Sequence, residues 1–210
     1  MEVISQRIHD YMAQRLKMDE DTIQTLRSRY VGLYGTTMRG LILEHGVDAE
    51  DYLHYVHDFP VEQFLVRSDR LDQVLEELPW QKVIFTSSTR EHAHLVLGAL
   101  GVERHFPRVY DIRDTGYVGK PAGSAFRTLF DGIHAEPQQC VLLDDSVANL
   151  RAASELGMAT VGVGCQEGAE GVDWCVERVE DVLGLFESLV KALCPGDEGL
   201  STTIHRRAND

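Results

Sequence analysis

The feature that most constrains the fold is a short apolar run at residues 141–146, Val-Leu-Leu-Asp-Asp-Ser, which ends in two adjacent carboxylates. A run this short and this continuously apolar is typical of a strand buried on both faces of a parallel sheet. Asp144 and Asp145 then lie at the strand's carboxyl end, the edge where open α/β sheets bind ligands. Two neighbouring negative charges cost free energy unless a cation, a lysine or several donors compensate them, and a hard divalent ion such as Mg²⁺ is the natural choice. The competing interpretation is that one aspartate only caps the helix expected over residues 147–156.

A second buried-strand pattern occupies residues 82–90 and runs into four consecutive hydroxyl residues, Thr86, Ser87, Ser88 and Thr89. Hydroxyls and free backbone N–H groups at the start of a helix suit a phosphate. A threonine that ends a strand is more often a helix cap, so this segment alone does not identify a site.

A third segment is the tripeptide Gly119-Lys120-Pro121, a turn after which Pro121 is well placed to begin a helix. The Lys120 ammonium can neutralise both a bound phosphate and the paired aspartates. A Gly-Lys-Pro sequence by itself is usually just a turn. The order of Thr86, Lys120 and Asp144-Asp145 along one chain is far more specific than any of the three segments alone.

The pattern of apolar residues divides the chain into two regions and a tail. Residues 1–68 show consecutive helical stripes that end at Gly46 and at Phe59-Pro60, which predicts a small α-helical bundle. Residues 69–193 alternate helix and strand, which predicts an α/β fold with a parallel sheet and crossover helices. The polar tail, residues 194–210, is expected to be disordered. Further strands are expected at residues 109–110 and 158–163, and a last helix at residues 179–193.

Composition narrows the class of function. The 210 residues are 43% hydrophobic and carry a formal net charge of −14, which disfavours binding to nucleic acid and to anionic membranes. No run is long enough to span a membrane and the first residues lack the apolar stretch of a signal peptide, so a cytoplasmic protein is expected. The oligomeric state stays undetermined. The cysteines show no Cys-x-x-Cys pairing, so neither a zinc site nor a disulfide framework is expected. They are Cys140, Cys165, Cys175 and Cys194.

With Thr86, Lys120 and Asp144-Asp145 following a helical region, the chain resembles the haloacid dehalogenase-like superfamily of phosphohydrolases from Met1 to about Gly164. Residues 34–41 (Tyr-Gly-Thr-Thr-Met-Arg-Gly-Leu) and the Asp-Asp-Ser form of the acidic motif resemble its pyrimidine 5′-nucleotidase branch. The resemblance implies a Rossmannoid parallel sheet with an α-helical cap domain over residues 1–68, and a core over residues 69–193.

The chain departs from this family at its beginning. The resemblance implies a first strand that ends in Asp-x-Asp and carries the nucleophile, but the one Asp-x-Asp of this sequence, Asp19-Glu20-Asp21, follows a helical stripe and is expected to cap a helix. The missing strand belongs at the centre of the sheet, and without it two strand edges are unpaired. We therefore expect that Met1 is a misassigned start or that the sequence is truncated.

The resemblance also implies roles for the residues that match its motifs. Thr86 would hydrogen-bond a phosphoryl oxygen, and Lys120 would screen the charge that grows on the phosphoryl group. Asp145, supported by Asp144, would hold Mg²⁺. Ser87 stands where the nucleotidase branch often has Asn, so the backbone N–H groups of Ser87 and Ser88 are expected to bind the anion.

Substrate specificity is expected to come from the helical region, where Tyr34, Thr36, Thr37 and Arg39 are the candidates for contact with the substrate. The competing interpretation is that the threonines cap the next helix and Arg39 is solvated. Two further histidines are interpreted as ordinary residues of helical surfaces, with nothing in the sequence to place them near a phosphate. They are His57 and His92.

Three functions are compatible with the sequence. The first is a Mg²⁺-dependent phosphomonoesterase for nucleoside monophosphates, and the second is the same fold acting on another small ester such as a sugar phosphate. The third takes Met1 as the true start and leaves a catalytically inactive module that binds a phosphate ligand or a partner chain. Thr86, Lys120 and the aspartate pair argue mildly against the third, because a pure binder needs no pair of metal ligands.

Overall fold

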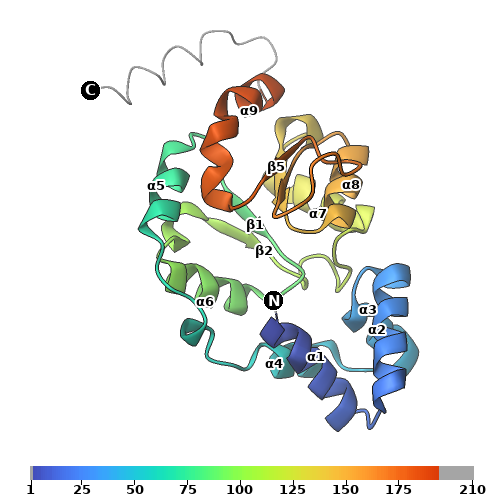
Figure 1. The fold of residues 1–210 in the computed structure, drawn as a ribbon. Helices are drawn as coiled ribbons and strands as arrows, with labels where there is room; N and C mark the ends of the chain where they lie inside the picture. Colours follow the sequence, from blue (N-terminus) through green and yellow to red (C-terminus); the bar gives the residue numbers. More distant parts are fainter. Residues whose placement is uncertain (1, 194–210) are drawn as a thin grey trace. The chain divides into compact units, whose positions relative to one another are not determined.

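The computed structural model describes residues 2–193 and divides into two compact units (Figure 1). Unit 1 comprises residues 1–69 and 80–128, and unit 2 comprises residues 70–79 and 129–210. The helices and strands are α1 (Glu2–Gln14), α2 (Glu20–Tyr34), α3 (Thr37–His45), α4 (Ala49–His57), η1 (Val61–Gln63), α5 (Asp69–Glu77), β1 (Val83–Phe85), α6 (Arg90–Leu100), η2 (Glu103–His105), β2 (Arg108–Tyr110), α7 (Gly123–Ile133), η3 (Pro137–Gln139), β3 (Val141–Asp144), α8 (Val147–Glu155), β4 (Ala159–Val163), β5 (Trp174–Val176), η4 (Val179–Leu185) and α9 (Phe186–Leu193).

The helical part of unit 1 follows local capping signals in the sequence. Asp19 caps α2 by accepting the Thr22 N–H at 2.9 Å, so the Asp-x-Asp segment is a helix cap as predicted. Asp48 caps α4 in the same way. Gly35 and Gly46 end α2 and α3 with φ values of 79° and 63°, a left-handed conformation that glycine adopts without a steric penalty.

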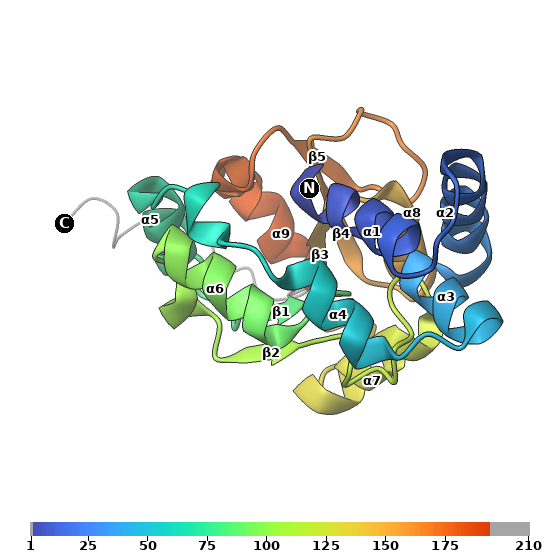
Figure 2. The same cartoon turned by 90° about the horizontal axis from the view of Figure 1, so that it is seen from below.

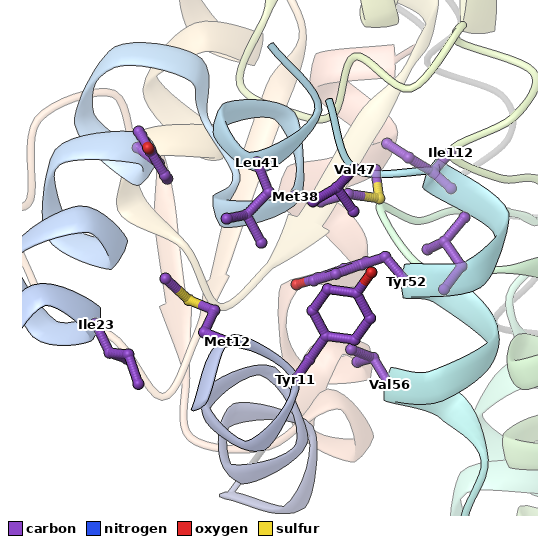
Figure 3. Packing of buried hydrophobic residues seen from close by; sticks show 11 residues of the cluster. Tyr11, Met12, Ile23, Met38, Leu41, Val47, Tyr52, Val56 and Ile112 are labelled. Carbon is purple, nitrogen blue, oxygen red and sulfur yellow. The ribbon is translucent and has the colours of Figure 1, made fainter. Parts of the chain in front are cut away.

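A hydrophobic core holds these helices together (Figure 3). α1 and α4 lie side by side in both views of the ribbon, and the Tyr11 and Tyr52 rings meet edge to face with centroids 5.1 Å apart (Figures 1 and 2). Ile112 joins the same cluster from the segment after β2, which ties the helices to the strands of unit 1. The buried members of the cluster are Tyr11, Met12, Ile23, Tyr30, Met38, Leu41, Val47, Tyr52, Leu53, Val56 and Ile112.

The strands are parallel, as predicted, and form two separate sheets. In unit 1, β1 pairs with β2 and Phe85 lies opposite Tyr110. In unit 2 the order is β3-β4-β5, and Asp144 lies opposite Gly162. Among residues 2–193, β1 pairs only with β2 and β3 only with β4, so each of them has one unpaired edge. The expectation that a central strand is missing between them stays a prediction.

Three details of the predicted elements are wrong. β5 is absent from the sequence-based assignment, because its three residues lie between Asp173 and Glu177 and are not part of a longer apolar run. The last predicted helix is a 3₁₀ segment, η4, followed by the α-helix α9. α7 begins at Gly123, so Pro121 lies before the helix and does not start it.

The prediction that the cysteines form no disulfide is also wrong. Cys165 and Cys175 form a disulfide with their Cα atoms 6.1 Å apart. Cys175 pairs with Gly162 in the register of β4 and β5, and a Cβ on Gly162 would lie 2.3 Å from the Cys165 sulfur. The overlooked strand β5 therefore brings the two cysteines together. The cytoplasmic location stays a prediction.

The division into a cap, residues 1–68, and a core, residues 69–193, also stays a prediction, because the compact units follow a different division of the chain. The tail, residues 194–210, lies outside the described residues. No helix within residues 2–193 is long and apolar enough to cross a membrane.

Replacement of Gly40 by alanine is expected to destabilise the protein by about 1–3 kcal/mol, because the core has no room for the added methyl group. A Cβ on Gly40 would lie 2.1 Å from Cγ of Tyr30, whose side chain is fully buried. Urea denaturation measures the effect.

The matched control is Gly32→Ala in α2, where a Cβ would meet nothing within 4 Å. This change is expected to stabilise the protein by about 0.5–1 kcal/mol, because alanine loses less backbone entropy in a helix than glycine. Equal stability of Gly40→Ala and the wild type would contradict the packing of Tyr30 on α3.

Candidate active site

The four hydroxyl residues after β1, residues 86–89, form a loop that we call the hydroxyl loop. The Thr86 N–H donates to the Tyr110 carbonyl at 2.9 Å, which continues the pairing of β1 with β2 by one residue. The Thr86 Oγ1 atom accepts the Ser88 N–H at 3.0 Å, and Thr89 caps α6 by accepting the His92 N–H at 3.2 Å. The Ser88 N–H is therefore used inside the loop, whereas it was expected from the sequence to bind an anion.

Lys120 reaches the hydroxyl loop from the turn before α7. Its Nζ donates to the Phe85 carbonyl oxygen at 2.8 Å and lies 5.1 Å from the centroid of the Phe85 ring. Phe85 immediately precedes Thr86, so the ammonium stands next to the start of the loop. The Phe85 ring packs edge to face on Phe126 of α7, which is fully buried. The structure thus brings together Lys120 and Thr86, two candidates that are far apart in the sequence.

Gly119 allows this close approach. A Cβ on Gly119 would lie 2.7 Å from Oγ of Ser87 and 2.9 Å from Cγ2 of Thr36, both too close for a real side chain. The turn that carries Lys120 is therefore in contact with the hydroxyl loop and with the start of α3. Three of the segments that the sequence singled out meet in unit 1.

A buried carboxylate, Asp111, fixes the segment that leads from β2 to Lys120. It is completely buried and accepts the backbone N–H groups of Arg90, Arg113 and Asp114 at 3.0–3.2 Å. Burial alone would raise the pKa of Asp111, but these donors and the Arg90 guanidinium outweigh it and hold the pKa below its ordinary value. The carboxylate is therefore charged at neutral pH.

Arg113 extends this anchor to the helices. Its guanidinium donates to both carboxylate oxygens of Glu50 in α4 at 2.8 Å and to Glu91 in α6 at 2.8 Å. The Tyr117 hydroxyl donates to the same Glu50 at 2.8 Å. These bonds hold the pKa of Glu50 and of Glu91 below its ordinary value. The segment before Gly119 is thus bonded to Glu50 of α4 through two side chains, Arg113 and Tyr117.

The substrate candidates in the helical region have structural partners in most cases. Thr36 caps α3 by accepting the Arg39 N–H at 3.1 Å, Thr37 is buried, and the Tyr34 hydroxyl donates to Glu44 at 2.9 Å. The Arg39 guanidinium has no hydrogen bond or ion pair within the described part of the chain. A substrate contact stays a prediction for all four residues, and Arg39 is the one whose charge has no partner within residues 2–193.

The interpretation of His57 as an ordinary surface residue is wrong. Its Nε2 atom is hydrogen-bonded to Oγ of Ser88, and its Nδ1 atom lies 2.9 Å from the Leu53 carbonyl oxygen. The His92 ring packs against it with centroids 4.7 Å apart and the ring planes tilted by 41°, and His92 Nδ1 is buried without a partner among the described residues. The contact with Ser88 joins residues 31 positions apart, so sequence spacing gave no signal for it.

Electrostatics keep His57 neutral. Burial, together with the neighbouring His92, lowers the pKa of His57 to about 4, and burial lowers the pKa of His92 as well. Both rings are therefore uncharged at pH 7.

The acidic pair lies in unit 2, at the carboxyl end of β3. Asp144 Oδ1 accepts the Ser146 N–H at 2.9 Å and the Asn149 side-chain amide at 3.0 Å, and Ser146 caps α8. Asp145 is exposed and its carboxylate has no hydrogen bond or ion pair within residues 2–193. Ser146 therefore caps α8, and neither aspartate does. The Asp145 oxygens are accessible to a cation.

This donor set fits Mg²⁺. A hard cation takes carboxylate oxygens, and Mg²⁺ in particular needs only one or two of them besides water and phosphate. The described residues contain no group of three or more His, Cys, Asp or Glu side chains that could hold a metal ion, so a site with a full set of protein ligands is not formed there. Two carboxylates, one of them fixed by Asn149, meet the smaller requirement of Mg²⁺.

The chain is similar in sequence to known hydrolases. A protein-family model described as hydrolase, haloacid dehalogenase-like hydrolase, matches residues 4–157. The protein named "Phosphate metabolism protein 8" of Saccharomyces cerevisiae is 25% identical over 175 residues, which are 76% of this chain and 54% of that protein. The chain thus spans about half the length of this curated relative.

Solved structures share the fold. The β-phosphoglucomutase of Clostridium difficile superposes with a TM-score of 0.63 at 21% identity, over 91% of this chain and 90% of that chain. The HAD-hydrolase YfnB of Bacillus subtilis, solved bound to magnesium, superposes with a TM-score of 0.51 at 15% identity, over 89% and 79% of the two chains. At such identities the likeness concerns the fold alone, and it confirms the predicted α/β fold with parallel strands.

Replacement of His57 by glutamine is expected to make stability less dependent on pH. The folded-state pKa of about 4 lies below the ordinary 6.5, so between these values the unfolded state binds more protons. The stability that the neutral ring contributes is complete above pH 6.5 and is lost as the pH falls toward 4. The wild type should therefore lose about 1–2 kcal/mol more than His57→Gln between pH 7.5 and pH 5.

Urea denaturation at the two pH values measures this difference. His54→Gln is the matched control, because His54 is exposed on the same helix. A pH dependence that is unchanged in His57→Gln would show that the ring is not held neutral by the fold.

Proposed function

The chain belongs to the haloacid dehalogenase-like hydrolase family, and from that membership we propose that it is a Mg²⁺-dependent phosphomonoester hydrolase, a pyrimidine 5′-nucleotidase that acts on nucleoside monophosphates. The observation that carries the proposal is the hydrogen bond from Lys120 Nζ to the Phe85 carbonyl, which holds a cation at the start of the hydroxyl loop. A cation beside a cluster of hydroxyls is the arrangement that an anionic phosphate ester needs.

Thr86 and Lys120 have complementary roles in this proposal. The Thr86 Oγ1 atom already accepts the Ser88 N–H, so its own proton is available to donate to a phosphoryl oxygen. The Lys120 ammonium screens the negative charge that accumulates on the phosphoryl oxygens as the ester bond breaks. Ser87, in contact with the Lys120 turn, contributes its backbone N–H or hydroxyl to the same anion.

Asp145 would hold Mg²⁺, and Asp144, oriented by Asn149 and the Ser146 N–H, would assist it. When bound, the ion supplies electrostatic stabilisation to the phosphoryl oxygens. The residues of the chain bind and orient the ester, and none of them is assigned here as the nucleophile that the family resemblance implies.

The proposal also assigns residues to the nucleoside part of the substrate. Arg39, whose guanidinium has no hydrogen bond or ion pair among the described residues, is assigned to the nucleoside. Tyr34, Thr36 and Thr37 are assigned to its surroundings. The name of the yeast relative refers to phosphate metabolism, which supports a phosphate compound as the substrate. We keep the cytoplasm as the proposed location and nucleic acid polymers and membranes as excluded partners, in line with the net charge of −14.

A panel of phosphate esters tests the activity. Protein isolated from its natural source, with its intact mass measured beside the 23.6 kDa of this chain, is incubated with Mg²⁺ and each ester, and released phosphate is measured. We expect hydrolysis of UMP and CMP well above that of glucose 6-phosphate, and a loss of at least about 100-fold for Lys120→Met, since one electrostatic contact to the transition state contributes that much.

Lys191→Met, an exposed lysine in α9, is the matched control and should leave the rate unchanged. Faster hydrolysis of glucose 6-phosphate than of UMP and CMP would contradict the nucleotidase assignment and indicate a sugar phosphatase. Phosphate binding without hydrolysis of any ester would instead favour the inactive binding module.

The Mg²⁺ assignment is tested by binding, without any turnover. Isothermal titration of MgCl₂ into the protein is expected to show binding that Asp145→Asn weakens by at least about tenfold, because one of two anionic ligands becomes neutral. Asp131→Asn, an exposed aspartate of α7 in the same unit, should bind like the wild type. Equal affinity of Asp145→Asn and the wild type would remove Asp145 from the metal site.

A further inference from the structure

We propose that His57 is a positioning residue for the hydroxyl loop: from the end of α4 it holds the Ser88 side chain, and through Ser88 it sets the direction in which the Thr86 hydroxyl donates. The inference rests on the proposed function, because it concerns how the same loop holds a phosphate. It assigns a role in phosphate binding to a residue of the helical region that the family motifs do not include.

The direction of the hydrogen bonds follows from the acceptor on Nδ1. His57 Nδ1 lies 2.9 Å from the Leu53 carbonyl oxygen, and a carbonyl can only accept, so Nδ1 carries the proton. In a neutral imidazole the other nitrogen, Nε2, then has a lone pair and accepts. The Ser88 hydroxyl therefore donates to His57, and its oxygen presents only lone pairs to any ligand of the loop.

Ser88 in turn orients the Thr86 hydroxyl. With its side chain held by His57 and its carbonyl oxygen accepting the Ile112 N–H at 3.2 Å, Ser88 is fixed on two sides. Its own N–H donates to Thr86 Oγ1 at 3.0 Å. Because Oγ1 accepts on that side, the Thr86 proton points away from the Ser88 N–H. Of the Ser88 and Thr86 hydroxyl protons, only that of Thr86 is available to an oxyanion.

A role as general base is disfavoured by the surroundings of the ring. A base would become an imidazolium, but His57 is packed against the His92 ring and the Phe59 side chain touches that ring in turn. The group that orients His57 is the neutral Leu53 carbonyl, which does not stabilise a charged ring as a carboxylate would. The positive charge of Arg113 disfavours an imidazolium at His57, and the negative charge of Glu91 offsets only part of this effect. Ser88 therefore keeps its proton, and His57 acts by orientation.

The test is the affinity for inorganic phosphate, measured by isothermal titration at pH 7.5 in the presence of Mg²⁺. His57→Leu removes the acceptor for the Ser88 hydroxyl. It is expected to weaken phosphate binding about tenfold, because the charge-assisted hydrogen bond from the Thr86 hydroxyl to the phosphate is lost. His57→Gln keeps an acceptor at a similar reach and should restore most of the affinity. His54→Leu, on the exposed side of the same helix, is the control and should bind like the wild type.

A spectroscopic measurement accompanies the titration. In protein labelled with ¹⁵N-histidine, the His57 ring should show the neutral tautomer protonated on Nδ1 at pH 7. If His57→Leu does not fold, Ser88→Ala takes its place, because it removes the same bond from the other side and is expected to produce the same loss.

The outcomes separate this inference from the proposed function. A wild-type protein that binds no phosphate would overturn both. Phosphate binding that is equally tight in the wild type and in His57→Leu, or a His57 ring protonated on Nε2, would overturn the positioning role and leave the proposed function standing. Weakening by His57→Leu with recovery in His57→Gln supports it.

Discussion

The buried Asp111 carboxylate is the constraint on which the arrangement of unit 1 depends. A fully buried charge costs several kcal/mol unless donors surround it, and here the chain supplies three backbone N–H groups and two guanidinium groups. One of these, Arg113, also binds Glu50 and Glu91, so a single residue joins the segment after β2 to two helices. Removal of Asp111 would leave the backbone N–H groups of Arg90, Arg113 and Asp114 without this acceptor.

The position of the candidate phosphate site follows from this anchor. The segment that begins at Asp111 ends at Lys120, and Tyr117 is bonded to Glu50 on the way, so the ammonium arrives at Phe85 from a fixed direction. His57 lies on the same helix as Glu50 and holds Ser88. One helix therefore contacts the candidate site twice, once through the Lys120 segment and once through the hydroxyl loop.

The sequence was most informative where the signal is local. The Asp19 cap and the acidic end of β3 depend on a few adjacent residues, and these predictions are confirmed. The Thr36 cap agrees with the competing interpretation of that threonine. The parallel strands follow from the alternation of helices and strands. By contrast, the Cys165–Cys175 disulfide depends on β5, and the bond between His57 and Ser88 depends on how α4 packs. Such contacts between distant residues leave no periodic pattern, and they are what the sequence analysis missed.

The division of the chain has a consequence for synthesis on the ribosome. Residues 70–79 belong to unit 2 but leave the ribosome between two segments of unit 1. Arg70 of α5 pairs with Asp181, 111 residues later, and α5 lines a shared hollow with η4. Since domains fold as they emerge, α5 waits for almost the whole remaining chain before its partners exist. During that interval its apolar face, with Val74 and Leu75, is exposed to chaperones and to other nascent chains.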